Sequence, residues 1–157
     1  MCVRAADSWT DTQVLGKGLE VMPRSPQDIV PKVLKVLRKE YPDASCSLNF
    51  RDPLELLVAT VLSAQCTDER VNQVTKDLFE KYKTARDYAT APPGQLEQDI
   101  QSTGFYKNKA KNLRQCCQQL DERFGGKVPR NLDDLVSLPG VGRKTANVVL
   151  GTAYGIP

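Results

Sequence analysis

The stretch Leu138-Pro139-Gly140-Val141-Gly142-Arg143-Lys144-Thr145-Ala146-Asn147 decides how the rest of the chain is interpreted. Two glycines and a proline form a tight turn between two apolar helical patterns. Glycine allows positive φ and a close approach of a ligand to the backbone, and we expect this freedom at Gly140 and Gly142. Free amides where the second helix begins, together with Arg143 and Lys144, suit an anion such as phosphate. The pattern is typical of a helix-hairpin-helix that grips a DNA backbone, and alone it indicates little more than DNA binding.

Length and charge are consistent with one globular domain that contacts nucleic acid. The chain has 157 residues and a formal net charge of only +3, so the total charge is weak evidence. The distribution is more informative, because a basic segment leads into the hairpin and suits a phosphate backbone. For its individual lysines, a solvated helix face is the better interpretation. The basic residues are Lys107, Lys109, Lys111, Arg114, Arg123, Lys127 and Arg130.

Residue types that are missing exclude several kinds of site. The sequence has no histidine, which excludes Ser-His-Asp and Cys-His catalysis and histidine-bound zinc. Its five cysteines lack paired spacing and follow no signal-peptide core, so we expect an intracellular protein, in the cytoplasm or nucleoid of a bacterium or in a eukaryotic nucleus. Cys116 and Cys117 are adjacent on an expected helix and are best explained as packing residues. No apolar run is long enough to cross a membrane.

The remaining pattern predicts an all-α chain of seven or eight helices. Residues 1–24 are expected to be a flexible tail, and residues 25–157 one helical domain. Capping signals at Ser25, Asp52 and Asn131 predict three helix starts. The run Leu54–Ala64 is apolar nearly all round, which favours a buried central helix.

Two short polar segments fall at junctions between helices. Ser63-Ala64-Gln65-Cys66-Thr67-Asp68 follows the central helix, and Thr67 or Asp68 is well explained as a cap for the next one. Phe105, Tyr106 and Lys107 combine aromatic rings with a cation, as in a tip that stacks on bases and contacts phosphate. For Phe105, a hydrophobic staple into the following helix is an equally good interpretation.

Three motifs together resemble the endonuclease III family. They are the segment 54–68 ending in Ser-Ala-Gln-Cys-Thr-Asp, the segment Gly104-Phe-Tyr-Lys-Asn-Lys-Ala110, and the hairpin stretch from Leu138. They occur in the family's order with similar spacing, and the resemblance covers about residues 27–157. It implies a six-helix barrel-type domain of the helix-hairpin-helix superfamily, acting as a DNA glycosylase and AP lyase on oxidised pyrimidines and abasic sites. The implied partner is duplex DNA. The resemblance also implies that the protein is a monomer and does not associate with a membrane.

The resemblance also assigns roles to individual residues. Lys144 matches the nucleophile that attacks the sugar C1′ and forms a Schiff base before β-elimination. Because the damaged nucleotide must leave the stack, Gln65 would fill the vacated space and Phe105 would wedge in from the other side. The other expected DNA contacts are Tyr106, Lys107, Pro139, Gly140, Val141, Gly142, Arg143 and Thr145.

Some of the family's features find no match in these 157 residues. The family carries a catalytic aspartate in a Val-Asp-Thr-His-like motif, and four cysteines that hold a [4Fe-4S] cluster. Neither is present here, so we expect no cofactor in this chain and weak or absent base excision, while lyase action on a ready-made abasic site survives. We also expect exposed apolar surface where the family's remaining helices would pack. The alternative is a non-catalytic helix-hairpin-helix remnant that only binds DNA.

Overall fold

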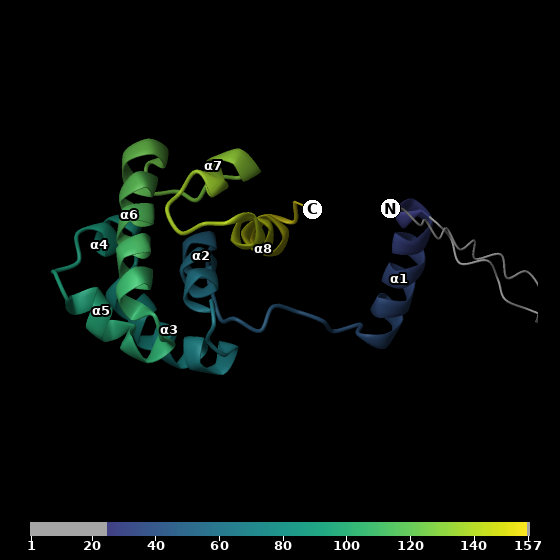
Figure 1. The fold of residues 1–157 in the computed structure, drawn as a ribbon, viewed down its shortest axis with the longest axis horizontal. Coiled ribbons are helices and arrows are strands. Elements are labelled where there is room, and N and C mark those ends of the chain that lie inside the picture. The colour runs from purple at the N-terminus through teal and green to yellow at the C-terminus, as the bar shows by residue number, and fades with distance from the viewer. Residues whose placement is uncertain (1–24, 157) are drawn as a thin grey trace, which may run out of the picture. The chain divides into compact units, whose positions relative to one another are not determined.

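A computed structural model describes residues 25–156, so the expected tail over 1–24 lies outside the described residues. By their contacts, the described residues divide into two units, with the division between Ala44 and Ser45. The first contributes helix α1 (Pro26–Glu40), and the second contains the other helices (Figure 1). The boundary at residue 25 stays a prediction. All regular secondary structure between residues 25 and 156 is helical, which confirms the all-α expectation.

Helix α1 begins as its capping signal predicts. The Ser25 side chain accepts a hydrogen bond from the Gln27 amide at 3.3 Å, and Pro26 occupies the first helical position. None of the helix is buried, because a single helix cannot cover its own apolar stripe. Its exposed apolar side chains are Ile29, Val30, Val33, Leu34, Val36 and Leu37.

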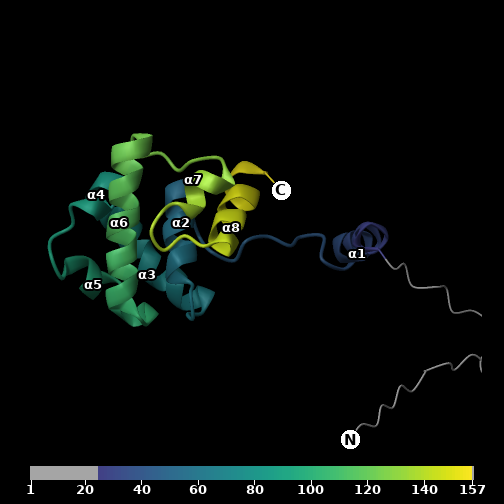
Figure 2. The same cartoon turned by 45° about the horizontal axis from the view of Figure 1, so that its top comes forward.

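The second unit is built around α2 (Pro53–Leu62). This helix contacts α3, α6 and α8, and it lies between α6 and α8 in both ribbon views (Figure 1 and Figure 2). Leu56, Leu57 and Val58 are at most 1% exposed, which confirms the predicted buried central helix. The other elements are α3 (Asp68–Lys81), α4 (Ala85–Ala89), α5 (Gln95–Asp99), the 3₁₀-helix η1 (Gln101–Thr103), α6 (Tyr106–Phe124), α7 (Leu132–Val136) and α8 (Arg143–Tyr154).

Side-chain caps begin several of these helices. Asp52 accepts from the Glu55 amide at 2.9 Å, and Asn131 accepts from the Asp134 amide at 2.8 Å. Thr67 accepts from the Arg70 amide at 3.3 Å, so it is the cap of α3. In each case the cap bonds an amide that has no partner within the helix.

The adjacent cysteines of α6 belong to the core. Cys116 and Cys117 are each 1% exposed, which confirms that they are packing residues. Burial raises the pKa of the Cys116 thiol to about 12 and raises that of Cys117 well above its ordinary value. Cys46 and Cys66 are partly buried free thiols. Between residues 25 and 156, no helix combines the length and apolar character that a membrane crossing requires.

Candidate functional site

The turn between α7 and α8 is fixed to the core by two apolar side chains. Leu138 and Val141 are 2% and 5% exposed, and the Val141 amide donates to the Leu138 carbonyl at 3.1 Å. Gly140 has φ +77°, as predicted, and a Cβ there would lie only 2.8 Å from the Asn112 Cβ of α6. Glycine is therefore required at this position by the fold itself.

Gly142 differs from the expectation. Its φ is −85° and its ψ is 170°, so the predicted need for positive φ at this residue is wrong. Extended backbone is usual for a residue that precedes a helix, and most residues adopt it. A Cβ at Gly142 would meet no atom within 4 Å. The protein does not need glycine here for its own packing, whereas a ligand approaching the backbone would benefit from the missing side chain.

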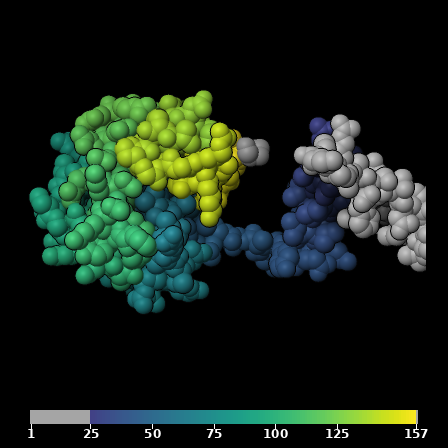
Figure 3. Space-filling model, viewed as in Figure 1, coloured from purple at the N-terminus to yellow at the C-terminus, as the bar shows by residue number. Residues whose placement is uncertain are grey.

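Helix α8 begins with unpaired amides. It has no side-chain cap, and the first intrahelical hydrogen bond runs from the Ala146 amide to the Gly142 carbonyl at 3.0 Å. The amides of Arg143, Lys144 and Thr145 therefore have no partner within the helix. Arg143 and Lys144 are exposed, and Thr145 is partly buried. In the space-filling view, side chains of α8 lie at the surface of this unit beside those of α7 (Figure 3). This helix start can accept an anion and presents a free amine beside it.

Gln65 lies in a tight turn after α2. The Cys66 amide donates to the Ser63 carbonyl at 3.1 Å, and Thr67 then caps α3. Gln65 is exposed and has φ +53°, in the left-handed region that non-glycine residues rarely adopt. The turn therefore presents the amide side chain to solvent between two firmly held helix ends.

Phe105 lies in a similar position before α6. Its side chain is 66% exposed and its φ is +48°, so the interpretation as a hydrophobic staple is wrong. Tyr106 is partly buried against the core, while Lys107 is exposed. Between residues 25 and 156, Gln65 and Phe105 are the only non-glycine residues with positive φ. Left-handed backbone at non-glycine residues is enriched at functional sites.

Lys109 does not behave as a member of the basic segment. It is only 6% exposed, so it is unsuited to a phosphate contact. Its ammonium donates to the Leu62 carbonyl at 2.8 Å and to the Thr103 carbonyl at 2.7 Å. The sequence could have indicated this burial, because helical spacing places Lys109 on the same face as the apolar residues Leu113 and Cys116.

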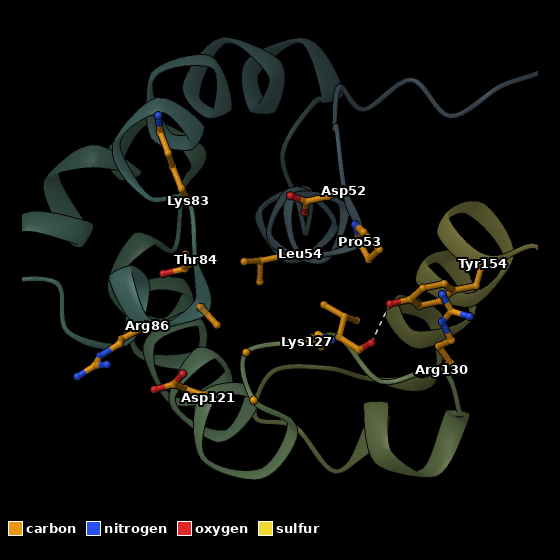
Figure 4. Close-up of a pocket in the computed structure, with 14 residues that line it drawn as sticks. Asp52, Pro53, Leu54, Lys83, Thr84, Arg86, Asp121, Lys127, Arg130 and Tyr154 are labelled. Carbon is orange, nitrogen blue, oxygen red and sulfur yellow. Dashed lines mark hydrogen bonds between the residues drawn. The ribbon is translucent and has the colours of Figure 1, made fainter.

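A cavity of about 590 Å³ lies elsewhere in the second unit (Figure 4). It is lined by the first residues of α2 and α4 and by the chain after α6, and none of the candidate DNA contacts lines it. On one side, Arg130 lies over the Tyr154 ring at 4.9 Å, and the Tyr154 hydroxyl donates to the Val128 carbonyl at 2.7 Å. The candidate site is therefore an exposed surface rather than this cavity.

The described residues do not fit an iron–sulfur cluster. Cys116 and Cys117 are buried in the core of α6, while Cys46 and Cys66 lie in different loops. No three cysteine, aspartate or glutamate side chains between residues 25 and 156 gather as a metal-binding group.

Comparison with known proteins identifies the family. The family model of the HhH-GPD superfamily of base excision DNA repair proteins matches residues 58–152. This range covers more than half of the chain and contains Gln65, Phe105 and the hairpin. The chain belongs to this superfamily.

Endonuclease III of Synechocystis sp. is 53% identical over 125 residues, which are 80% of this chain and 57% of the relative. Endonuclease III of Bacillus subtilis is 56% identical over 117 residues, which are 74% of this chain and 53% of the relative.

The predicted membership of the helix-hairpin-helix repair superfamily and the predicted resemblance to endonuclease III are thereby confirmed, and the chain spans little more than half the length of these relatives. Solved structures of the family agree. A non-covalent endonuclease III–DNA complex matches this HhH-GPD chain with a TM-score of 0.79 and 53% identity, over 85% of this chain and 62% of the other. A trapped endonuclease III–DNA covalent intermediate matches it with the same TM-score, identity and coverage.

Proposed function

We propose that this chain binds damaged duplex DNA in base excision repair and acts as an AP lyase with Lys144 as its nucleophile, while its glycosylase step is weak or absent. Membership of the superfamily supports the repair role, and the DNA-bound endonuclease III structures support DNA as the partner. The observation that carries the assignment of Lys144 is its position, exposed in the first turn of an uncapped helix directly after the hairpin.

The hairpin supplies the grip on the backbone. A phosphate placed at the start of α8 would accept hydrogen bonds from the free amides and would be attracted by Arg143. The missing side chain at Gly142 leaves space for it. These contacts carry no base specificity, so they would hold any duplex and bring Lys144 close to a deoxyribose.

The exposed residues Gln65 and Phe105, the two tips of this surface, supply recognition of the lesion. An extruded nucleotide leaves a gap and an unpaired base on the opposite strand. The Gln65 amide both donates and accepts hydrogen bonds, so it suits the edge of an orphaned base. The Phe105 ring, 66% exposed, suits insertion between neighbouring bases.

The lyase step uses the amine of Lys144 on an abasic site. The neutral amine adds to the C1′ aldehyde of the sugar, and loss of water gives an iminium ion. A base then removes a proton from C2′, and the C3′–O bond breaks with departure of the 3′ phosphate. Water later hydrolyses the iminium and returns the lysine.

Borohydride trapping on an abasic-site duplex tests this assignment. Reduction of the iminium gives a stable covalent adduct, which we expect for the unchanged chain and not for Lys144→Ala. Lys76→Ala is the matched control, because it removes an exposed lysine from α3 and should leave the adduct yield unchanged. An undiminished adduct with Lys144→Ala would show that another amine reacts.

The same experiment separates the enzyme from a DNA-binding remnant. Binding of the abasic-site duplex without any adduct would favour the non-catalytic alternative. The expectation of weak base excision stays a prediction. Release of an oxidised pyrimidine by the purified 157-residue chain, at a rate comparable to that of a full-length relative, would contradict it.

A further inference from the structure

The buried ammonium of Lys109 takes no part in the proposed DNA contacts or in the lyase reaction. A lysine is rarely buried unless a partner compensates its charge, and here the side chain is only 6% exposed. None of the ion pairs found between residues 25 and 156 includes it. Its hydrogen-bond partners are instead the carbonyl oxygens of Leu62 and Thr103. Both bonds are short, charge-assisted and shielded from water, so they are stronger than average.

These two carbonyls lie just before the two exposed tips. Leu62 is the last residue of α2, and Gln65 follows three residues later. Thr103 is the last residue of η1, and Phe105 follows two residues later. Because one nitrogen binds both oxygens, at 2.8 Å and 2.7 Å, the oxygens lie within about 5.5 Å of each other. The ammonium therefore limits the distance between the two backbone segments that lead into Gln65 and Phe105.

Both tips need such support, because their backbone conformations are unfavourable for their residues. Gln65 and Phe105 have φ of +53° and +48°, in the left-handed region where the Cβ of an L-residue is crowded by the backbone. Neither exposed side chain is held in place by core packing, so the flanking backbone must hold the turn. The Leu62 carbonyl would otherwise be an unpaired group at the end of a helix.

We propose that Lys109 is a positioning residue whose ammonium clamps the Leu62 and Thr103 carbonyls and thereby sets the spacing of Gln65 and Phe105 for entry into DNA. The role in DNA rests on the proposed function, whereas the clamp is a property of the free protein. Burial lowers the pKa of Lys109, and the neighbouring Cys66 opposes this shift. The two carbonyl acceptors are the groups that compensate the buried charge.

The clamp is tested first without DNA. Lys109→Met keeps the length and apolar stem of the side chain and removes the donors, and Lys76→Met is the matched control on an exposed face. By hydrogen–deuterium exchange, we expect about tenfold faster exchange in both segments 63–67 and 103–106 of Lys109→Met. Segment 147–153 of α8 and the control variant should be unchanged. Unchanged exchange in the two tip segments of Lys109→Met would overturn the clamp.

The role in DNA is tested by dependence on the tips. We expect Lys109→Met to bind an abasic-site duplex about tenfold more weakly, while its affinity for undamaged duplex stays within about twofold. In a Gln65→Ala/Phe105→Ala background, the Lys109→Met effect should fall below about twofold, because the groups it positions are already gone. A fold-stabilising role alone would give the same loss in both backgrounds, which would overturn the positioning role.

Each failure points to a different proposal. If the unchanged chain does not prefer the abasic-site duplex, the proposed function fails, and the exchange experiment still decides the clamp. If the preference is present but Lys109→Met retains it, only the positioning role fails. Should Lys109→Met lack a cooperative unfolding transition, Lys109→Gln replaces it, because its shorter neutral side chain cannot hold both carbonyls with a charge.

Discussion

Replacing Gly140 by alanine tests how closely the hairpin packs on α6. An L-residue at φ +77° costs about 1–2 kcal/mol. The new Cβ would lie 2.8 Å from the Asn112 Cβ, inside the ordinary carbon–carbon contact of about 3.5–4.0 Å. Overpacking of this kind costs about 1–3 kcal/mol, while the stiffer unfolded chain returns about 0.4–1 kcal/mol. We therefore expect Gly140→Ala to lower the free energy of unfolding by about 1–4.5 kcal/mol.

Urea unfolding followed by far-UV circular dichroism measures this loss. Gly142→Ala is the matched control two residues away, because its φ of −85° suits alanine and no atom lies within 4 Å of the new Cβ. It should lose less than about 1 kcal/mol, since alanine is only a poorer cap than glycine. Adding Asn112→Gly removes the opposing Cβ, so the steric part of the Gly140→Ala cost should disappear in the double variant.

Two results would refute this reasoning. A loss below about 1 kcal/mol for Gly140→Ala would mean that the turn and α6 move apart easily. An equal loss for Gly140→Ala and Gly142→Ala would mean that the two glycines share one general role, contrary to their different backbone conformations and surroundings.

Three further changes have definite expected outcomes. Gly142→Ser should change the free energy of unfolding by less than about 0.5 kcal/mol, because serine caps a helix well. It should weaken the binding of duplex DNA about tenfold, measured by fluorescence anisotropy, because the serine hydroxyl would bind an amide that phosphate would otherwise use. Gln65→Gly should be about 1 kcal/mol more stable than Gln65→Ala in urea, since only glycine relaxes at φ +53°, and equal stabilities would exclude strain there. Burial raises the pKa of Asp99, but hydrogen bonds from Lys81 and Tyr82 outweigh it and hold the pKa below its ordinary value of 3.8. Because the folded-state pKa is lowered, this stabilisation is present above 3.8 and is lost as the pH falls through the folded-state value. Asp99→Asn should thus lower the free energy of unfolding, measured in urea, by about 1–2 kcal/mol at neutral pH and by progressively less in acid. A difference between the variant and the unchanged chain that does not depend on pH would contradict the lowered pKa of Asp99.

Local chemistry made the helix starts predictable. Asp52 and Asn131 bond amides only three residues away, so the short sequence around each contains all the information that its cap needs. The central helix was predictable for a similar reason, because a run that is apolar on every side is stable only when buried. The hairpin could be recognised from its glycines and proline, although sequence alone assigned both glycines the same role.

Contacts between distant segments were not predictable in this way. The Leu62 carbonyl lies 47 residues before Lys109, and no local pattern indicates that one will bind the other. The need for glycine at Gly140 depends on Asn112 of another helix, whereas Gly142 faces open space. Exposure of Phe105 likewise depends on where the chain before α6 meets the rest of the fold. Such features follow from tertiary packing, which the spacing of residues only partly encodes.

Chemical labelling of the buried thiols of α6 can measure how often the core of this unit opens. Cys116 and Cys117 are each 1% exposed, and burial raises the pKa of both thiols, so alkylating reagents do not reach a reactive thiolate in the folded state. Labelling of Cys116 and Cys117, followed by mass spectrometry, would therefore count only molecules whose core has opened. The rate of labelling in dilute reagent, compared with that of an unfolded chain, gives the opening free energy of the α6 core under native conditions, with no denaturant and no engineered cysteine.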